Sequence, residues 1–453
     1  MRFGTDGVRG RAISEISPEL ALGLARVLAA EIRPTAVALG GDSRESTPVL
    51  AAAVASGMAA MGVDVVDLGM VPTPVVARVA QERTAAGVPT MGVVVSASHN
   101  HFSDNGIKVF DIGGRKLPEA VEHRVEERLA EGAVTAGGTR VGVIDTVDRA
   151  AVIAGHIEHV RRAIGGRSLS GLRVVVDAAN GAASPIAGPL LEALGADVEV
   201  INDRPNGRNI NDRCGATDPS GLARAVVDRR ADVGIALDGD ADRLIAVDAD
   251  GRIVDGDHVI AICALDMAGR GVLARSGVVV TVMANLGFRR AMEAAGIAVV
   301  ETPVGDRHVL EALLDGGLSL GGEQSGHVIL PEVATTGDGL LTGAVLLDVV
   351  RRSGRTLGES ASAAMTPLPQ VLVNVEVAGS PDERRRVGER IASHLAAAEA
   401  RLADRGRILV RPSGTEPLVR IMVEAESDAE ATEIAGDLAD AVRASTGGAP
   451  PAG

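Results

Sequence analysis

The sequence repeats one order of segments three times, and this repetition limits the folds that are open to the chain. Each unit holds three short apolar runs, rich in β-branched residues, with Ala- and Leu-rich stretches of helical character between them. The runs lie at 35–42, 62–68 and 91–96, at 172–177, 195–201 and 232–237, and at 278–282, 296–300 and 318–322. Strands that alternate with helices are typical of α/β domains, and any such protein alternates this way. The shared order favours true repetition, which predicts three related mixed α/β domains.

The character of the sequence changes after about residue 368. Residues 371–377 alternate apolar and polar side chains, and a helical stretch at about 382–403 is followed by apolar runs at 407–410 and 419–423 and by a last helix. This order predicts a small C-terminal α+β domain. A chain of 453 residues has room for four domains. We expect them at residues 1–150, 151–254, 255–368 and 369–445, with a flexible tail at 446–453.

Charge and composition exclude several classes of partner. The net charge is −15, from 45 Lys and Arg against 60 Asp and Glu, whereas nucleic acids and anionic membranes require a basic surface. Aromatic residues make up only 1% of the chain, which argues against stacking on bases. No apolar run approaches 18 residues, and no signal peptide is evident. Cys214 and Cys263 are too few for a disulfide framework, so we expect a reducing, cytoplasmic location.

A polar loop follows the third apolar run of each unit. These loops are Ser96–Asn100, Asp238–Asp242 and Glu323–His327. Ligands of α/β sheets bind outside the carboxyl ends of the strands, so we expect the three loops to meet at one central cleft.

The loop at 238–242 carries the strongest local signal. Asp238, Asp240 and Asp242 stand at alternate positions after an apolar run, and three carboxylates so placed suit one hard cation such as Mg²⁺. A calcium EF-hand does not fit, because Arg243 and Ala249 stand where Gly and Glu are required. A solvated acidic turn stays possible, although its clustered carboxylates would repel one another.

The other loops are weaker signals when each is taken alone. Ser98 beside His99 suits a nucleophile, or a capping serine next to a surface histidine. Glu323, Ser325 and His327 suit sugar hydroxyls and proton transfer, or form an ordinary polar loop. Lys108 could supply a positive charge near the serine loop, and the alternative is an ordinary solvated lysine.

A fourth polar segment lies between two apolar runs of the C-terminal domain. Arg411, Ser413, Gly414 and Thr415 bring an arginine, two hydroxyls and free N–H groups together, and Arg420 follows on the next run. These residues could form a phosphate-binding site, and the alternative is an ordinary turn rich in Gly and Pro.

Taken together, these loops and the opening Phe3–Gly10 resemble the α-D-phosphohexomutase family over nearly the whole chain. The resemblance implies four domains around a central cleft. It implies that Ser98 carries a phosphoryl group and that Ser98, Asp238, Asp240 and Asp242 hold one Mg²⁺ per subunit. It also implies a sugar 1,6-bisphosphate as activator.

The remaining family positions imply further roles. Arg9, Lys108 and His327 match positions for proton transfer or charge stabilisation, and Arg243 adds a positive charge nearby. Glu323 and Ser325 would bind sugar hydroxyls. The non-reacting phosphate would be held by Arg411, Ser413, Gly414, Thr415 and Arg420.

Three features point to one branch of the family. The opening Phe3–Gly10, Cys214–Thr217 and especially Gln324 resemble the branch that interconverts D-glucosamine 6-phosphate and D-glucosamine 1-phosphate, a step toward UDP-N-acetylglucosamine and peptidoglycan. Relatives that act on glucose or mannose phosphates, in the phosphomannomutase/phosphoglucomutase branch, usually have Met at the position of Gln324, and this branch is the main rival.

Two functions of a different class also stay open. A metal-dependent phosphatase would need carboxylates and Mg²⁺ as well, and a non-catalytic sensor would bind sugar phosphates without turnover. The partners expected are small sugar phosphates, with no nucleic acid and no membrane, and a homodimer is possible.

One residue departs from the family pattern. His101 follows His99-Asn100 where the family usually has Pro, whose fixed φ would stiffen the loop. We expect a more mobile Ser98 loop, although a contact between His101 and a phosphate would also fit.

Overall fold

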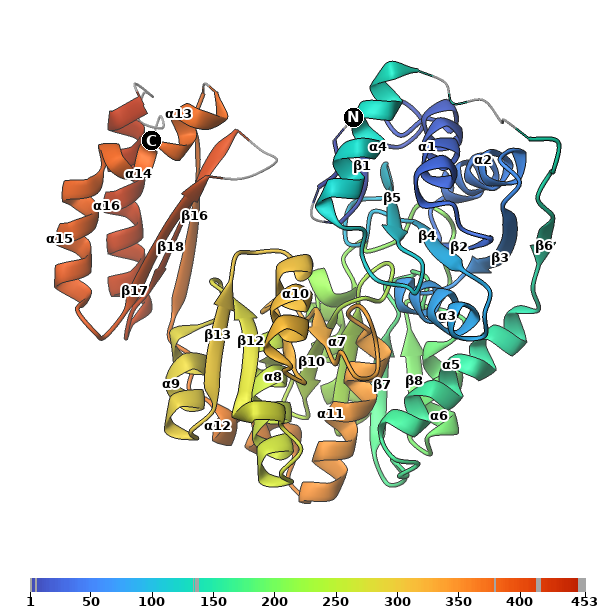
Figure 1. Cartoon of the computed structure of the whole chain (residues 1–453). Helices are drawn as coiled ribbons and strands as arrows, with labels where there is room; N and C mark the ends of the chain where they lie inside the picture. Colours follow the sequence, from blue (N-terminus) through green and yellow to red (C-terminus); the bar gives the residue numbers. More distant parts are fainter. Residues whose placement is uncertain are drawn as a thin grey trace. The chain divides into compact units, whose positions relative to one another are not determined.

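The computed structural model describes residues 2–446 except for residues 5, 133, 135–137, 379 and 413–416. It divides into two compact units (Figure 1). The first comprises residues 1–283 and 295–364, and the second comprises residues 284–294 and 365–453. Within the described residues, the first unit contains three β-sheets and the second contains one.

The three sheets of the first unit share one strand order. In each sheet the first strand of the repeat lies in the middle and pairs in parallel with the second strand on one side and the third strand on the other. A fourth strand pairs with the third and is antiparallel to it. In that order the sheets contain β3 (Asp64–Met70), β2 (Ala36–Gly41), β4 (Thr90–Val95) and β5 (Asp104–Phe110); β8 (Asp197–Ile201), β7 (Arg173–Asp177), β9 (Val233–Leu237) and β10 (Leu244–Asp248); β13 (Ala298–Thr302), β12 (Gly277–Thr281), β14 (Gly321–Gly322) and β15 (Val328–Ile329). The predicted fold class of three related mixed α/β domains is therefore confirmed.

The antiparallel fourth strand determines where the polar loops lie. The third strand turns directly into the fourth, so each loop predicted to be functional is the connection between these two strands: β4 to β5, β9 to β10, and β14 to β15. Extra edge strands extend two sheets: β1 (Val8–Arg11) pairs with β5, β6 (Ile144–Thr146) with β3, and β11 (Ile253–Val254) with β10. The strand expected at 318–322 is reduced to Gly321–Gly322.

Helices cover both faces of the first sheet. Alternation along β2 directs Val37 and Leu39 to one apolar cluster, packed under α1 (Pro18–Ile32) and α2 (Thr47–Ala60), and Ala38 to another under α3 (Thr73–Ala85). Helix α1 begins where Ser17 accepts the N–H of Leu20 at 3.2 Å, with Pro18 in the first turn. The remaining helices of eight or more residues in this unit are α4 (Glu119–Glu131), α5 (Arg149–Ala163), α7 (Ser220–Arg229), α8 (Gly256–Gly269), α10 (Asp306–Gly316), α11 (Gly339–Ser353) and α12 (Leu357–Ala364).

The second unit is an antiparallel sheet covered by helices. Its strand order is β16 (Gln370–Glu376), β18 (Leu418–Glu424) and β17 (Arg407–Pro412), and its core packs β18 against α16 (Asp428–Thr446). Helix α9 (Leu286–Ala294) joins it through a hydrogen bond of 3.0 Å from the Leu286 N–H to Glu424. The helix expected at 382–403 appears as α13 (Pro381–Arg385), α14 (Val387–Arg390) and α15 (Ala392–Leu402).

These helices have one property in common. In the part of the chain that is described, every helix is too short or too polar to span a lipid bilayer.

Candidate active site

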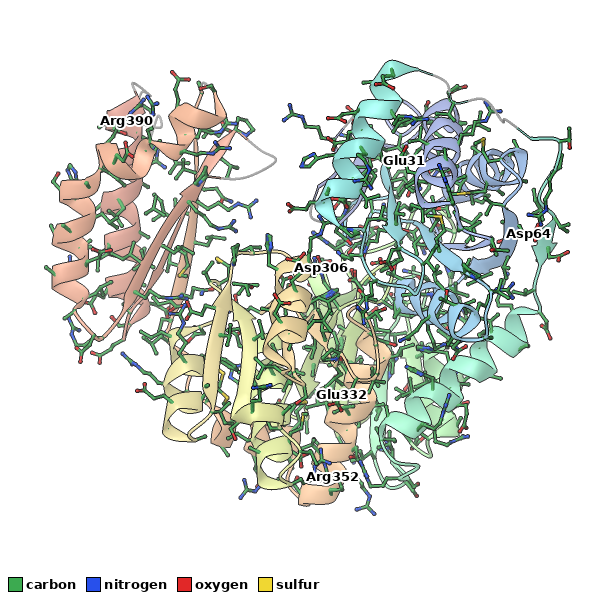
Figure 2. The ribbon with its side chains drawn as sticks, in the orientation of Figure 1. Glu31, Asp64, Asp306, Glu332, Arg352 and Arg390 are labelled. Atoms are coloured by element: carbon green, nitrogen blue, oxygen red, sulfur yellow. The ribbon has the colours of Figure 1, made fainter. Side chains whose placement is uncertain are left out.

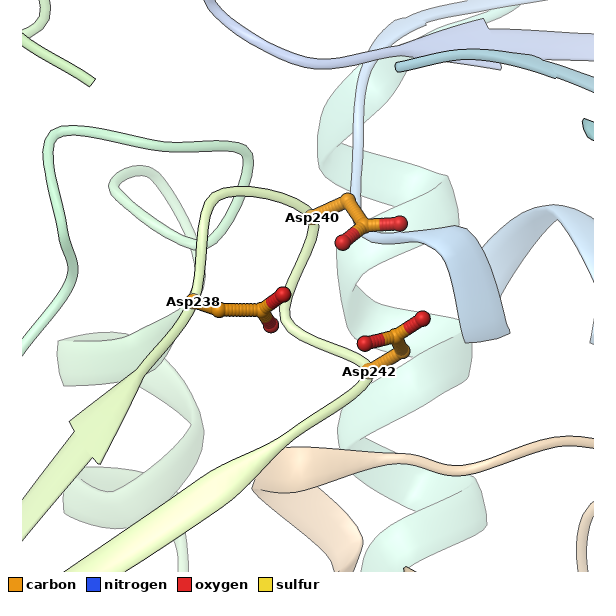
Figure 3. Close-up of side chains that lie close together, drawn as sticks. All are labelled: Asp238, Asp240 and Asp242. Atoms are coloured by element: carbon orange, nitrogen blue, oxygen red, sulfur yellow. The ribbon is translucent and has the colours of Figure 1, made fainter. Parts of the chain in front are cut away.

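Three carboxylates meet in the loop between β9 and β10 (Figure 3). One carboxylate oxygen from each of Asp238, Asp240 and Asp242 lies within 4.8 Å of the others, and all three side chains are buried. Among the described residues, Oδ1 of Asp240 and Oδ1 of Asp242 have no hydrogen-bond partner although both atoms are buried. Buried carboxylate oxygens without donors are costly, and a hard cation would satisfy them. The donor set therefore fits Mg²⁺.

The electrostatics of the three carboxylates differ. Burial and the neighbouring charges of Asp242 and Asp240 raise the pKa of Asp238 well above its usual value. Burial alone would also raise the pKa of Asp242, but Lys108 and His327 outweigh it and hold this pKa well below the usual range. The cluster thus keeps a negative charge at Asp242, on the side where the basic side chains lie.

Ser98 lies directly against this cluster. Its Oγ donates a hydrogen bond of 2.5 Å to Oδ2 of Asp238, although the two residues are 140 positions apart. The backbone at Ser98 is left-handed, with φ 52°, a conformation that is rare outside glycine and is often found at functional sites. Gly239 allows the close approach, because a Cβ there would lie 2.6 Å from the Ser98 carbonyl oxygen.

His99 is next to Ser98, with Nδ1 3.4 Å from the serine Oγ. Burial, followed by the charges of Arg243 and Arg9, lowers the pKa of His99 to about 4. The imidazole is therefore neutral at pH 7. His101 is exposed, and its Nδ1 lies 2.9 Å from Oγ of Ser103. The mobility expected from the missing proline stays a prediction.

Four side chains hold the Ser98 loop in place through hydrogen bonds. Asp42, Arg44 and Ser96 are buried and Asn211 is half-buried, and only Ser96 among them belongs to a loop identified from the sequence. Ser96 Oγ accepts the Ser98 N–H at 2.9 Å and donates to Asp42 at 2.6 Å. The Ser98 carbonyl accepts from Arg44 at 2.9 Å and from Asn211 at 3.0 Å. The only sequence signal for Asp42 and Arg44 is their place in a polar loop after β2, the first strand of the repeat.

Lys108 lies at the other side of the carboxylates. It comes from β5, and its Nζ contacts Oδ2 of Asp240 at 2.6 Å and Oδ2 of Asp242 at 2.8 Å. It also contacts Asp6 at 2.8 Å, and Asp6 in turn pairs with Arg9 at 2.6 Å. Burial would lower the pKa of Lys108, but the carboxylates outweigh burial and raise this pKa well above its usual value. Lys108 is therefore a fixed cation here.

The third loop, at 323–327, packs against the carboxylate loop. The Leu244 N–H donates to the Gly326 carbonyl at 3.0 Å, and a Cβ at Gly326 would lie 2.0 Å from the Leu244 oxygen. His327 Nε2 accepts the Gly337 N–H at 3.1 Å, which assigns the proton of a neutral ring to Nδ1, 3.8 Å from Asp242.

The sugar-binding candidates on this loop are also placed. Glu323 accepts the N–H of Gly305 at 3.1 Å, and Ser325 donates to Glu323 at 3.3 Å. The Nε of Arg243 lies 3.8 Å from Oδ1 of Asp242, and the backbone N–H of Arg243 donates a hydrogen bond of 3.2 Å to Oδ1 of Asp238. The structure thus brings together Arg9, Ser98, Lys108, the three aspartates, Arg243 and the loop at 323–327.

The candidate phosphate-binding residues belong to the second unit. Arg411 and Arg420 are directly opposite each other on the paired strands β17 and β18. Ser413, Gly414 and Thr415 lie outside the described residues. Their predicted roles stay predictions.

Comparison with known proteins identifies the family. Four domains described as phosphoglucomutase/phosphomannomutase match in order: alpha/beta/alpha domain I at residues 1–135, domain II at 154–251, domain III at 255–368 and the C-terminal domain at 372–441. The chain is 51% identical to a phosphoglucosamine mutase of Thermobifida fusca, over 97% of this chain and 98% of that protein.

Solved structures agree in fold. The chain resembles a phosphoglucomutase/phosphomannomutase family protein of Burkholderia thailandensis, with a TM-score of 0.81, 26% identity and 98% of each chain covered. It also resembles an Aspergillus fumigatus N-acetylphosphoglucosamine mutase in complex with GlcNAc-6P and magnesium, with a TM-score of 0.69, 22% identity, and 98% of this chain and 96% of that one covered. The chain therefore belongs to the phosphoglucomutase/phosphomannomutase family of phosphohexomutase isomerases.

Proposed function

We propose that this enzyme interconverts D-glucosamine 6-phosphate and D-glucosamine 1-phosphate, with a phosphoserine at Ser98 and a bisphosphorylated sugar as intermediate. The observation that carries the chemistry is the 2.5 Å hydrogen bond between Ser98 and the buried aspartate cluster. The observation that supports the substrate is the 51% identity to a protein named phosphoglucosamine mutase, together with Gln324 in the sugar loop.

The forward reaction begins with Ser98 phosphorylated and glucosamine 6-phosphate bound. The O1 hydroxyl of the sugar gives up its proton and attacks the phosphorus. The bond between phosphorus and Ser98 Oγ breaks, the bond between phosphorus and O1 forms, and the Ser98 oxygen takes up a proton. Lys108 and Arg243 place positive charge beside the transferring group, where negative charge is spread over the phosphoryl oxygens.

The second transfer regenerates the enzyme. The bisphosphorylated sugar turns over in the site without being released, so that its O6 phosphoryl group faces Ser98. Ser98 Oγ loses its proton and attacks, the bond between phosphorus and O6 breaks, and O6 takes up a proton. A free sugar 1,6-bisphosphate can phosphorylate Ser98 in the same way, which makes it an activator. Arg9, Lys108 and His327 are the candidates for proton transfer or charge stabilisation, and the raised pKa values of Arg9 and Lys108 favour charge stabilisation for these two.

The residues that would hold the metal are Ser98 and the three aspartates. Bound Mg²⁺ would neutralise charge on the phosphoryl group and so favour its transfer. An Aspergillus fumigatus N-acetylphosphoglucosamine mutase of the same fold was solved with GlcNAc-6P and magnesium, and we propose one Mg²⁺ per subunit for this chain.

The remaining candidate residues would bind the sugar. Glu323 is fixed by the Gly305 N–H, and it and Ser325 would accept and donate hydrogen bonds to ring hydroxyls. Arg411, Ser413, Gly414, Thr415 and Arg420 would bind the phosphate that does not react, and Arg411 and Arg420 are opposite each other on their strands. The product would supply UDP-N-acetylglucosamine and peptidoglycan synthesis in the cytoplasm.

The test compares kcat/KM for glucosamine 6-phosphate, glucose 6-phosphate and mannose 6-phosphate, with Mg²⁺ and the matching bisphosphates present. A strong preference for the amino sugar is expected, with sugar phosphate conserved and no free phosphate released. Equal or reversed preference would assign the enzyme to the phosphomannomutase/phosphoglucomutase branch, and steady release of phosphate would indicate a phosphatase. Gln324→Met should weaken the preference for the amino sugar, whereas Gln370→Met, a change of the same kind on β16, should not.

A further inference from the structure

Six side chains form a closed ring beside the Ser98 loop, and acids alternate with bases around it. In order they are Asp6, Lys116, Asp306, His327, Asp242 and Lys108. Three of them, Asp6, Lys116 and Asp306, were not predicted from the sequence and have no part in the proposed chemistry.

Lys116 makes the two contacts that connect the halves of this ring. Its Nζ lies 2.7 Å from Oδ1 of Asp6 and also contacts Oδ2 of Asp306. Oδ2 of Asp6 also contacts Nζ of Lys108 at 2.8 Å. Oδ2 of Asp306 also lies 3.6 Å from Nε2 of His327.

The ring joins segments that are far apart in the sequence. Asp6 precedes β1, Lys116 follows β5, and Asp306 is the first residue of α10, where it is labelled in Figure 2. Lys116 therefore connects the segment before β1 to the start of α10, close to the loop that carries the three aspartates. Its side chain is only 9% exposed. Burial would lower the pKa of Lys116, but Asp306 and Asp6 outweigh it and raise this pKa, so the side chain is a cation.

We propose that Lys116 is a positioning residue: by bridging Asp6 and Asp306, it holds Lys108 and His327 in place at the carboxylate loop. The role in turnover rests on the proposed function, because Lys108 and His327 act in that reaction. Without the Lys116 ammonium, the half-buried carboxylate of Asp6 and the buried carboxylate of Asp306 would share no cation. Asp6 would then draw Lys108 away from Asp240 and Asp242, and the uncompensated charge of Asp306 would act on His327, whose Nε2 lies 3.6 Å away.

A neighbouring ion pair offers a matched control. Arg307, on α10, pairs with Glu122, on α4, at 2.5 and 2.8 Å, and both side chains are buried. This pair joins the same two parts of the chain as the Lys116–Asp306 contact, but its side chains do not belong to the ring. Arg307→Met thus removes a comparable buried ion pair and leaves the ring complete.

The experiment compares Lys116→Met, Lys116→Arg and Arg307→Met in the full-length enzyme. Lys116→Met is expected to lower kcat by about tenfold or more with KM changed less than about threefold, because positioning of acting groups affects the transition state more than binding. Lys116→Arg is expected to recover most of kcat. Arg307→Met is expected to lower the melting temperature while keeping kcat within about threefold of wild type. Equal losses of kcat in Lys116→Met and Arg307→Met at equal melting temperature would overturn the proposal, as would a change confined to KM.

A second readout does not depend on the substrate. In crystal structures of wild type and Lys116→Met, Nζ of Lys108 is expected to move away from Asp240 or Asp242 in the variant. Unchanged positions of Lys108 and His327 would overturn the proposal whatever the kinetics show. The wild-type control separates this result from a failure of the proposed function: if wild type prefers glucose 6-phosphate, the substrate assignment is wrong, and the variants are compared on that sugar instead.

Discussion

The guanidinium of Arg44 donates a hydrogen bond of 2.9 Å to the carbonyl of Ser98, the residue that we propose to carry the phosphoryl group. The same fully buried side chain also reaches the carbonyls of Asn100, His101 and Asp104, and its Nε pairs with Asp42 at 2.8 Å. These contacts hold the serine loop from below while Ser98 keeps its left-handed backbone conformation. The planar fork of arginine suits this task, because it donates in several fixed directions at once.

Arg44→Lys should therefore impair phosphoryl transfer although it keeps the positive charge. A single ammonium group cannot donate to all the carbonyls that accept from the guanidinium, so the Ser98 loop loses its fixed geometry. We expect kcat to fall by about 10- to 100-fold. We also expect the free energy of unfolding to fall by about 2–4 kcal/mol, because buried acceptors lose their donors. Steady-state kinetics and urea unfolding measure the two effects. An exposed arginine, tested as Arg124→Lys, is the control, and an unchanged kcat in Arg44→Lys would show that the loop geometry does not depend on the fork.

Ser98→Ala should abolish turnover and leave the fold intact. The change removes the oxygen that would carry the phosphoryl group, and alanine is smaller than serine and fits the same space. Intact-protein mass spectrometry after incubation with the sugar bisphosphate should detect a phosphoryl group on wild type and none on the variant. Ser103→Ala, a change at a half-buried position near the end of the same loop, should behave as wild type. Turnover close to normal in Ser98→Ala would exclude a phosphoserine at this position.

The sequence predicts the fold class well because apolar runs and their order are local properties. It also predicts where the loops that carry Ser98 and Asp238 lie, because each follows a buried strand and ligands of α/β sheets bind outside the carboxyl ends of the strands. It does not give the direction of β5, β10 and β15, because a short apolar run looks the same in parallel and antiparallel strands.

Supporting residues are harder to predict than the candidate site residues. Lys116 and Asp306 are 190 positions apart in the sequence and come into contact only in the folded chain. Arg44 resembles any loop arginine until the fold buries it beneath Ser98. The identity of a charged residue shows neither its burial nor its partner, so these roles required the structure.

Removal of the metal should inactivate the enzyme reversibly. A chelator is expected to abolish turnover, and added Mg²⁺ to restore it. If the aspartates hold the ion, Mg²⁺ should also raise the melting temperature of wild type, because a ligand that binds only the folded state stabilises it. Asp238→Asn should remove most of that rise, whereas Asp250→Asn, at an exposed position after β10, should keep it. An equal rise in Asp238→Asn and wild type would place the ion elsewhere.

Arg411→Ala should weaken substrate binding by about 1.5–3 kcal/mol, the range for a hydrogen bond to a charged group. We expect KM to rise by the corresponding factor and kcat to change less, provided that KM follows affinity. The control is Arg401→Ala in the same unit, an arginine whose partner is Glu433 at 2.7 Å on α16. An unchanged KM in Arg411→Ala would show that another group binds the phosphate that does not react.

Asp338 should make stability depend on pH on the acid side. Its carboxylate caps α11 by accepting the Leu341 N–H at 3.0 Å, and it faces Nε2 of the buried His156 at 3.3 Å. Burial would raise the pKa of Asp338, but His156 and the Leu341 N–H outweigh it and lower this pKa. A lowered pKa in the folded state means that the charged carboxylate stabilises the fold above the unfolded-state pKa of about 4. That stability is lost as the pH falls through the lower, folded-state pKa.

Two substitutions separate the charge of Asp338 from its capping role. Asp338→Asn keeps a capping oxygen and removes the charge, so it should lower the free energy of unfolding by about 1–3 kcal/mol at pH 7. This difference from wild type should narrow as the pH falls below about 4, because wild type then loses the same charge. Asp338→Ala should cost about a further 1 kcal/mol at every pH, since it also removes the cap. Urea unfolding between pH 3 and pH 7 measures both effects. The opposite result would be a difference in the free energy of unfolding between wild type and Asp338→Asn that widens as the pH falls. It would mean that the pKa of Asp338 is raised in the folded protein, because a carboxyl group with a raised pKa stabilises the fold more when it is protonated.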